Sequence, residues 1–188
     1  MLRRLTEPYR YLTLKELTRL TVSAIAAVAK NGVIGANNDI PWRGEVPGEQ
    51  QLFKEFTLGK VVIMGRNTWE SLPPKYRPLP DRFNIVLTRS WEYYSGTFQL
   101  DSLEKALMLA EAHEDYDEAV LIGGQRVYEE GLPHCDKIYL TEIHGIYPGD
   151  TYFPKLNRAN WATTERREFP MTDSRRVAYT FNTLERIR

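Results

Sequence analysis

The chain has 188 residues, and its 25 basic and 25 acidic side chains balance to a net charge of zero. This length is enough for a single domain with a core that folds without covalent cross-links. Because Cys135 is the only cysteine, an internal disulfide is excluded and a reducing compartment, the cytoplasm, is expected. The balanced charge argues against a nucleic-acid-binding protein, and no run of about 18 apolar residues could span a membrane.

Residues 1–21 are expected to form an N-terminal extension of unassigned role, with the domain proper over residues 22–188. The beginning of the chain scatters single leucines among charged side chains and lacks the apolar block of a secretion signal. Thr13 and Glu16 have the spacing of a helix capping box, which favours a short appended helix over a transit peptide.

Short apolar runs separated by amphipathic segments predict alternating strands and helices. The strands are expected at 22–29, 61–64, 83–88, 119–122 and 137–143. The helices are expected at 49–58, 66–72, 102–112 and 125–130. Asp101 and Glu104 are expected to cap the third helix, and Gly131 is expected to end the fourth. Strands that alternate with helices indicate crossover connections and a largely parallel sheet.

The C-terminal part has a different pattern. Two strand-like segments, 161–169 and 176–185, are separated by the short segment 170–174 with no helix between them, which predicts an antiparallel hairpin at the sheet edge. The sequence therefore predicts an α/β fold: a mostly parallel central sheet of about eight strands, flanked by helices and ending in this hairpin.

Arg66, Arg89 and Arg126 each follow the end of a predicted strand. The carboxyl edge of a parallel sheet is where such folds bind ligands, and helix N-termini attract phosphate. The arginines could therefore surround a phosphate-rich cofactor, or they could be solvated side chains beside ordinary glycine turns. The two glycine turns beside these arginines are at Gly65 and at Gly123–Gly124. Neither matches the dinucleotide-binding fingerprint or the Walker loop.

Glu49 lies on the apolar stripe of its predicted helix, together with Leu52, Phe53 and Phe56. Two alternatives remain open from this spacing. The carboxylate could turn to solvent and favour the helix dipole, or it could point inward, where burial raises its pKa and suits it to hold a proton or a cationic ring. The preceding polar loop, 34–44, could cover a site, with Trp42 as part of it or only as a core anchor.

Metal and acyl-transfer chemistry are not predicted. His113, His134 and His144 lack zinc-ligand spacing, and Cys135 has no second thiol or nucleophile motif. A basic cluster around the terminal hairpin guards the sheet edge against aggregation or contacts an anionic partner; it comprises Arg166, Arg167, Arg175 and Arg176.

Taken in order, these segments resemble dihydrofolate reductase. The matching stretches are IAAVA at 25–29, VIG at 33–35, IPW at 40–42, Glu49 with 53–54, VIMGRNTWES at 62–71, RPLPDR at 77–82, IGG at 122–124 with 127–128, YLT at 139–141 and GDTYFP at 149–154. They occur collinearly over residues 22–188, and the ordered set is highly specific.

The resemblance implies hydride transfer from C4 of NADPH to C6 of dihydrofolate with protonation at N5, giving tetrahydrofolate for thymidylate synthesis and one-carbon metabolism. It also implies an antifolate target that is a cytoplasmic monomer and binds neither nucleic acid nor membrane. Two alternatives are a reductase of riboflavin synthesis with the same fold, which acts on a ribosylated pyrimidine, and a non-catalytic module that binds a pterin or nucleotide.

The resemblance also implies roles around the substrate. Glu49 would pair with the pterin 2-amino group and N3 and help a water protonate N5; Trp42 would help hold that water, and Thr141 would anchor Glu49 from behind. Arg82 would bind the α-carboxylate of the glutamate tail, with Leu79 against the benzoyl ring. The implied substrate-binding residues are Ile25, Ala27, Phe53, Leu79, Arg82, Ile122 and Tyr128.

For the cofactor, the resemblance implies a tight Gly123–Gly124 turn with a cis peptide, and phosphate contacts from Arg66, Thr68, Arg89 and Arg126 that favour NADPH over NADH. Ile40 would lie in a mobile loop that covers the nicotinamide. The implied cofactor-binding residues are Ala27, Ile34, Gly35, Ile40, Gly65, Arg66, Asn67, Thr68, Thr88, Arg89, Ile122, Gly123, Gly124, Gln125, Arg126, Val127, Tyr128 and Thr151. Departures from the commonest family pattern are Gln50, Asn67, Gln125 and two extra residues between Trp42 and Glu49.

Overall fold

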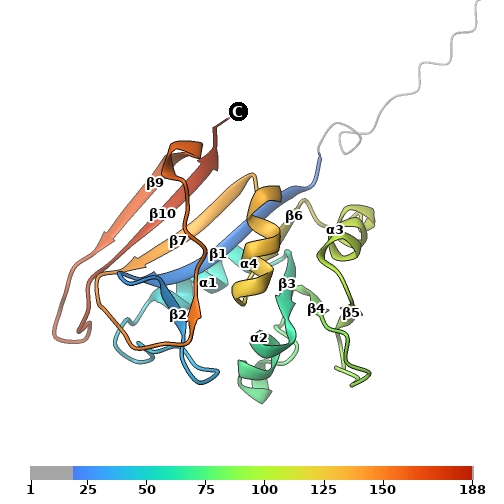
Figure 1. Ribbon diagram of the computed structural model, residues 1–188, viewed down its shortest axis with the longest axis horizontal. Coiled ribbons are helices and arrows are strands. Elements are labelled where there is room, and N and C mark those ends of the chain that lie inside the picture. Colours follow the sequence, from blue (N-terminus) through green and yellow to red (C-terminus); the bar gives the residue numbers. More distant parts are fainter. Residues whose placement is uncertain (1–18, 188) are drawn as a thin grey trace, which may run out of the picture.

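The computed structural model describes residues 19–187 of the chain. The capping box predicted at Thr13 and Glu16 lies outside the described residues. A central sheet has the strand order β5-β4-β3-β6-β1-β7-β10-β9 (Figure 1). The strands are β1 (Thr21–Ala29), β3 (Val61–Gly65), β4 (Phe83–Leu87), β5 (Phe98–Leu100), β6 (Glu118–Leu121), β7 (Lys137–Ile143), β9 (Trp161–Phe169) and β10 (Tyr179–Arg186).

Parallel pairing dominates this sheet. β1 pairs in parallel with β6 and β7, β3 with β4 and β6, and β5 with β4. The last strand, β10, lies between β7 and β9 and runs antiparallel to both. The predicted α/β fold with a C-terminal antiparallel hairpin is thus confirmed.

The hairpin and the shortest strands differ from the sequence prediction. β10 begins at Tyr179 instead of residue 176, because an isolated bridge between Thr172 and Arg175 closes a longer hairpin tip. β2 (Val33–Gly35) and β8 (Thr151–Tyr152) pair in a separate small sheet. Together with β5, these two strands were not predicted, because two or three residues are too few for a periodic pattern.

Helices follow the predicted positions closely. They are α1 (Glu49–Thr57), α2 (Arg66–Ser71), α3 (Leu103–Ala112) and α4 (Gln125–Gly131), with short 3₁₀ turns η2 (Pro74–Tyr76), η3 (Leu132–His134) and η4 (Arg158–Asn160). Both predicted helix-end signals are wrong in detail. The Ser102 side chain, not the Asp101–Glu104 pair, caps α3 by accepting from Lys105 N at 3.3 Å, because Asp101 is engaged by the Lys105 ammonium.

Gly131 also has a different role from the one predicted. Its φ of −95° is right-handed, and the chain continues directly into η3, so it is not a left-handed helix terminator. Its packing explains the residue: a Cβ there would lie 2.1 Å from Cδ1 of Leu121 on the central strand β6. Glycine thus lets α4 approach the sheet closely.

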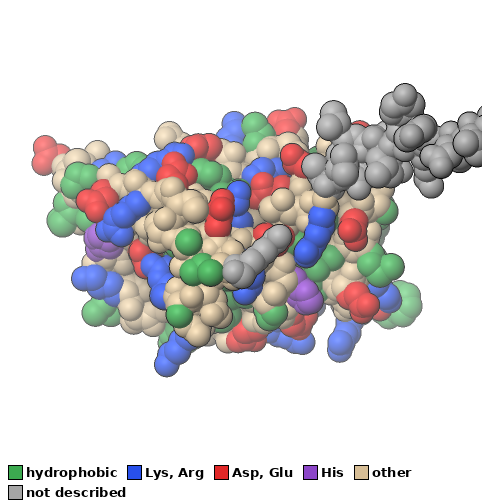
Figure 2. Space-filling model, turned by 90° about the horizontal axis from the view of Figure 1, so that it is seen from above, with side chains coloured by type: hydrophobic (Ala, Val, Ile, Leu, Met, Phe, Trp, Pro, Cys, Tyr) green, Lys and Arg blue, Asp and Glu red, His purple; other side chains and the backbone are tan. Residues whose placement is uncertain are grey.

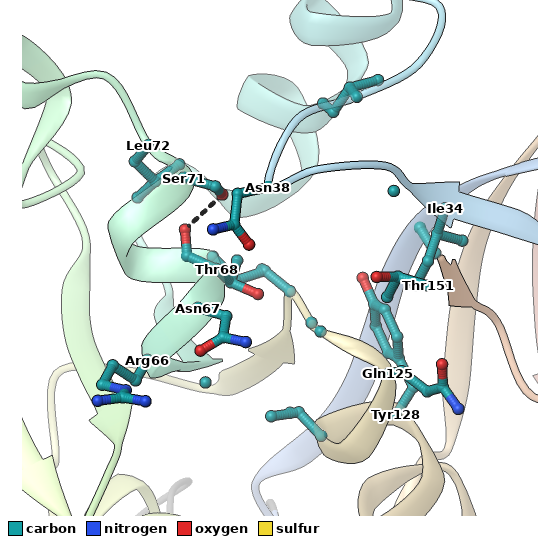
Figure 3. A pocket seen from close by; sticks show the side chains of 18 of the residues that line it. Ile34, Asn38, Arg66, Asn67, Thr68, Ser71, Leu72, Gln125, Tyr128 and Thr151 are labelled. Carbon is teal, nitrogen blue, oxygen red and sulfur yellow. Dashed lines mark hydrogen bonds between the residues drawn. The ribbon is translucent and has the colours of Figure 1, made fainter. Parts of the chain in front are cut away.

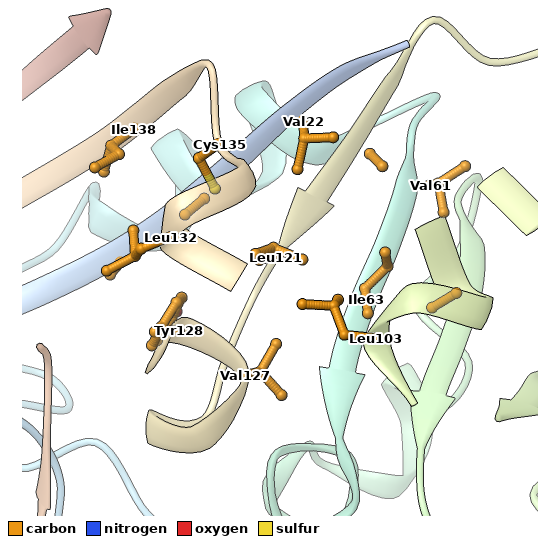
Figure 4. Close-up of a cluster of buried hydrophobic side chains, with 14 of the residues drawn as sticks. Val22, Val61, Ile63, Leu103, Leu121, Val127, Tyr128, Leu132, Cys135 and Ile138 are labelled. Carbon is orange, nitrogen blue, oxygen red and sulfur yellow. The ribbon is translucent and has the colours of Figure 1, made fainter. Parts of the chain in front are cut away.

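The central strands are buried on both faces, which accounts for their nearly continuous apolar sequences. Along β3, Ile63 packs into one hydrophobic cluster while Val62 and Met64 pack into the other. Figure 4 shows the first cluster, in which Leu103 of α3 and Val127 of α4 lie over the sheet. α1 and α2 supply side chains to the second cluster. On the face shown in Figure 2, charged side chains of both signs are interspersed.

A buried asparagine shapes the loop that precedes β4. The Asn84 side chain is 3% exposed and makes three hydrogen bonds to backbone. Its Oδ1 accepts from Leu79 N at 3.0 Å, while Nδ2 donates to Leu79 O and Arg82 O, each at 2.9 Å. These bonds fix Leu79 and Arg82 in the loop that leads into the start of β4.

We expect Asn84→Ala to lower the unfolding free energy by about 2–4 kcal/mol, because it strands buried backbone groups without partners. Urea unfolding measures this loss. Asn157→Ala is the matched control. It removes the exposed side-chain oxygen that accepts a hydrogen bond from Ala159 N, and it should lower the unfolding free energy by about 1 kcal/mol or less. Equal losses in the two variants would contradict the role given to the Asn84 bonds.

Candidate active site

A large cleft with a volume of about 1430 Å³ runs along the carboxyl edge of the parallel strands. Segments 34–43, α1 and α2 contribute to its walls, together with the loops after β4 and β6. Figure 3 shows Arg66, Asn67 and Thr68 of α2 on one side and Gln125, Tyr128 and Thr151 on the other. Every residue predicted for the site lines this cleft except Thr141.

Glu49 occupies the N-terminus of α1 and faces the cleft. Burial raises the pKa of its carboxyl group to about 7. The preceding residue, Gly48, has a φ of 100°, and a Cβ there would lie 2.9 Å from Oη of Tyr179. A glycine is therefore needed at this turn to direct the chain into α1 with Glu49 pointing inward. Of the two orientations left open by the sequence, the structure has the inward one.

Trp42 is a second polar element of the same wall. Its side chain is 2% exposed, and its indole N–H has no hydrogen-bond partner among the described residues. A buried donor of this kind is costly unless something in the cleft accepts from it. Trp42 and Glu49 both line the cleft, so together they offer a donor and a proton-binding group to whatever enters it.

Thr141 lies behind the wall of the cleft and not in it. It is 2% exposed in β7, between Ala27 of β1 and Phe181 of β10 in register. Alternation along β7 puts it on the same face as Tyr139 and Ile143, whose cluster also contains Leu52 of α1. Within residues 19–187, however, no hydrogen bond joins Thr141 to Glu49 and Thr141 does not line the cleft. Its role as an anchor for Glu49 stays a prediction.

The loop before β4 contributes an apolar side chain, Leu79, and a cation, Arg82, to the wall of the cleft. Leu79 is 6% exposed. Arg82 is half-buried, and its guanidinium donates from Nε to Pro80 O at 2.8 Å and from Nη1 to Thr57 Oγ1 at 3.0 Å. Burial lowers the pKa of Arg82, yet a guanidinium stays charged in proteins. The fork is held rigidly and retains N–H groups for an anion in the cleft.

Close backbone approach defines the opposite part of the cleft. The Gly123–Gly124 peptide is cis, and Gly65 N donates to Gly123 O at 2.8 Å. Gly123 has a φ of 105°, and a Cβ there would lie 3.1 Å from the ring of Tyr128. The Tyr128 hydroxyl in turn donates to Ile25 O at 2.6 Å. A glycine is therefore required at position 123, which leaves backbone of the turn facing the cleft.

Three exposed arginines surround this glycine-lined end of the cleft. Arg66 begins α2, Arg126 lies in the first turn of α4 and Arg89 follows β4. Arg66 and Arg126 are only loosely paired, with Glu70 at 3.8 Å and Glu130 at 3.5 Å. The structure thus brings together the arginines that the sequence left ambiguous, with cation chemistry that suits phosphates.

Other residues of the cleft were missed because they lie in irregular segments or adjoin predicted positions. Ser90 could have been found, since it follows the end of the predicted parallel strand β4. The residues not predicted for the site are Ala26, Ala36, Asn38, Asp39, Arg43, Gln50, Lys54, Ser71, Leu72, Pro73, Tyr76, Pro80, Leu87, Ser90, Asp101, Ser102, Leu103 and Glu130.

Neither a metal centre nor a membrane segment is found in the described part of the chain. Over residues 19–187, no group of three or more histidine, cysteine or acidic side chains is arranged to hold a metal ion. No helix in that range is long and apolar enough to cross a membrane.

The fold and the cleft match a known class of reductases. The family model for dihydrofolate reductase matches residues 21–186. The chain therefore belongs to the dihydrofolate reductase family, which confirms the family, the activity and the NADPH dependence predicted from the sequence.

Individual relatives are similar to this chain over most of its length. Dihydrofolate reductase of Neisseria gonorrhoeae is 44% identical over 163 residues, which are 86% of this chain and 96% of the relative. Dihydrofolate reductase type 3 of Salmonella typhimurium is 42% identical over 90% of this chain and its own full length. The structure of dihydrofolate reductase from Enterococcus faecalis, complexed with NADP(H) and RAB-propyl, has a TM-score of 0.80 and 32% identity, covering 90% of this chain and 98% of that chain.

We expect the burial of Glu49 to be measurable as a pH-dependent stability difference. Its folded pKa is about 7, whereas an unfolded glutamate titrates near about 4.3. Between these values the folded protein retains a proton that the unfolded chain has released, so ionisation lowers the stability of the native protein as pH rises. Relative to native protein, the unfolding free energy of Glu49→Gln should rise by about 3–4 kcal/mol between about pH 4 and about pH 8.

Urea titrations at the two pH values measure this gain. Glu55→Gln is the control, because Glu55 lies on the same helix but is exposed and paired with Arg167 at 3.1 Å. Absence of a pH-dependent gain in Glu49→Gln, or the same gain in both variants, would show that Glu49 is not desolvated.

Proposed function

We propose that this chain reduces 7,8-dihydrofolate to 5,6,7,8-tetrahydrofolate, with Glu49 orienting the pterin and a water held by Glu49 and Trp42 delivering the proton to N5. The observation that carries this proposal is the pair formed by a buried carboxyl group and an unpartnered indole N–H in one wall of the cleft. A pterin offers what this pair needs: an amino group and a ring N–H for the carboxylate, and polar edges close to the indole.

The raised pKa of Glu49 suits it to this work. A carboxyl group that titrates near pH 7 exchanges protons with little cost at physiological pH, as a group that assists proton transfer should. The indole N–H of Trp42 can only donate a hydrogen bond, so a water that accepts from it is held in one orientation. A water hydrogen-bonded to both Glu49 and Trp42 would be oriented towards the pterin ring. The apolar side chains of the wall would keep other water molecules out.

Arg82 and Leu79 would bind the rest of the substrate. The guanidinium, held at Pro80 O and Thr57 Oγ1, would bind the α-carboxylate of the glutamate tail through charge-assisted hydrogen bonds. Leu79 would pack against the benzoyl ring. Further apolar contacts to the pterin would come from Ile25, Ala27, Phe53, Ile122 and Tyr128, all of which line the cleft.

The residues at the other end of the cleft fit NADPH. The glycine turn at 123–124 has no room for a Cβ beside Tyr128, which is what close approach of a nicotinamide and pyrophosphate to backbone requires. When bound, NADPH supplies the hydride from C4. Arg66, Thr68, Arg89 and Arg126 would bind the phosphates, with Ile34, Gly35, Ile40, Gly65, Asn67, Thr88, Gln125, Val127 and Thr151 completing the site.

We further propose that residues 22–188, together with Thr21 at the start of β1, act as the catalytic domain of a cytoplasmic monomer, with the chain before them as an extension. The cleft is lined wholly by residues of one described chain, so a monomer suffices to bind both ligands. Cys135 is free and 1% exposed, which agrees with a reducing compartment.

A spectrophotometric assay of NADPH consumption with dihydrofolate tests the proposed function. We expect the native protein to consume NADPH only when dihydrofolate is present, and Glu49→Gln to lower turnover at neutral pH by about 100-fold. The deficit should shrink towards about pH 5, because substrate protonated in solution needs no help from Glu49.

Glu55→Gln on the same helix is the control and should retain native turnover. Native turnover of Glu49→Gln at neutral pH would refute the role of Glu49. The same assay separates the alternatives: consumption only with a ribosylated pyrimidine would indicate the riboflavin-pathway reductase, and ligand binding without consumption would indicate a non-catalytic module.

Arg82→Leu should weaken binding of dihydrofolate by about 100-fold, because a charge-assisted fork to a carboxylate is lost. A pterin that lacks the glutamate tail should lose little affinity, about 3-fold or less, since its ring does not reach the guanidinium. Fluorescence titration with both compounds measures the two constants. Equal losses for both compounds would place the effect in the pterin pocket and contradict the proposed contact.

A further inference from the structure

Tyr147, in the loop between β7 and β8, contacts both Trp42 and Glu45. Its ring meets the Trp42 indole edge-on, with centroids 5.3 Å apart and an interplanar angle of 64°. Its hydroxyl donates to Glu45 Oε2 at 2.9 Å, and Glu45 N donates to Trp42 O at 2.9 Å. A closed set of contacts thus links the tyrosine to the tryptophan through both side chain and backbone.

Tyr147 is itself held in place. Asn31 Nδ2 donates to Tyr147 O at 2.8 Å. The ring lies directly over Gly145, where a Cβ would come within 2.6 Å of Tyr147 Cε2. Burial, together with the hydrogen bond to Glu45, raises the pKa of Tyr147 to about 12, so the hydroxyl remains a donor throughout any enzymatic pH range.

The segment that carries Glu45 also connects Trp42 to Glu49. Besides the Tyr147 bond, Glu45 O accepts from Arg176 N at 3.1 Å, from the tip of the β9–β10 hairpin. Further along, Pro47 O lies 3.4 Å from the Tyr179 hydroxyl. The neighbouring cation, Arg43, is paired with Asp39. The segment is therefore fixed from two distant parts of the chain, with Glu45 as the residue that both reach.

We propose that Tyr147 and Glu45 are positioning residues that hold the indole N–H of Trp42 in the direction needed to orient the proton-delivering water beside Glu49. This inference rests on the proposed function and adds a pair of residues to it. Tyr147 does not line the cleft, and neither does Glu45, so any effect on turnover must pass through Trp42 or the segment between Trp42 and Glu49.

Tyr147→Phe and Glu45→Leu test this pair, because each removes the same hydrogen bond from one side. Each should lower turnover about 10-fold above neutral pH, since a small misplacement of an orienting group is costly. KM for NADPH should change by about 2-fold or less. The deficit should vanish towards about pH 5, where protonated substrate bypasses the oriented water.

Two further variants sharpen the comparison. Glu45→Gln should retain native turnover, because its amide oxygen still accepts from the Tyr147 hydroxyl. The double variant Tyr147→Phe/Glu45→Leu should be no slower than either single variant, because both act through one bond. Tyr152→Phe is the matched control: it removes a hydroxyl that donates to Gly149 O at 3.0 Å in the same loop, and it should leave turnover and its pH profile unchanged.

Native pH profiles in Tyr147→Phe and Glu45→Leu, a deficit that is equal at all pH values, or additive losses in the double variant would overturn the inference. Thermal unfolding of each variant separates these outcomes from loss of fold; if Tyr147→Phe unfolds, Glu45→Leu and Glu45→Gln decide alone. If the native protein does not consume NADPH with dihydrofolate, the proposed function fails instead, whatever these variants do.

Discussion

The arrangement of the site depends on one carboxyl group held in an apolar wall. Removing Glu49 from water raises its pKa to about 7, and such a cost persists in a folded protein only where the surroundings enforce it. Here they do: Gly48 supplies the turn that no side chain could make beside Tyr179, and Leu52 of the same helix is buried beneath. A ligand that hydrogen-bonds to Glu49 recovers part of this cost, so the fold selects for cationic or donor-bearing rings.

The two ends of the cleft differ in the chemical groups that line them. Near Glu49 the walls include the apolar side chains of Ile25, Ala27 and Phe53. At the glycine turn, backbone replaces side chains, and exposed arginines surround it. A single parallel sheet produces both halves, because its carboxyl edge presents strand ends, helix N-termini and loops side by side. Substrate and cofactor can thereby meet over the central strands β1 and β6.

The sequence predicted what depends on local pattern and missed what depends on distant contacts. The strands buried on both faces and the amphipathic helix of Glu49 have periodicities that survive folding, and their positions were predicted closely. For Arg66, Arg89 and Arg126, spacing alone favoured solvated side chains over a cofactor site; the ordered resemblance to a family, not the pattern, favoured the cofactor. The close packing of Gly131 against Leu121 depends on which neighbour the fold provides. The bond between Tyr147 and Glu45 joins residues 102 positions apart, and no single-sequence pattern encodes such a pair.

The place of β10 in the sheet has a consequence for biosynthesis. This strand is the last of the domain in sequence, yet it lies inside the sheet between β7 and β9. The segment just before it also supplies Arg176 to Glu45. A nascent chain emerging from the ribosome therefore lacks an interior strand until β10 has been translated, and β7 keeps an open edge in the meantime. Completion of the sheet accordingly waits for β10, and until then the edge of β7 is open to pairing with another chain.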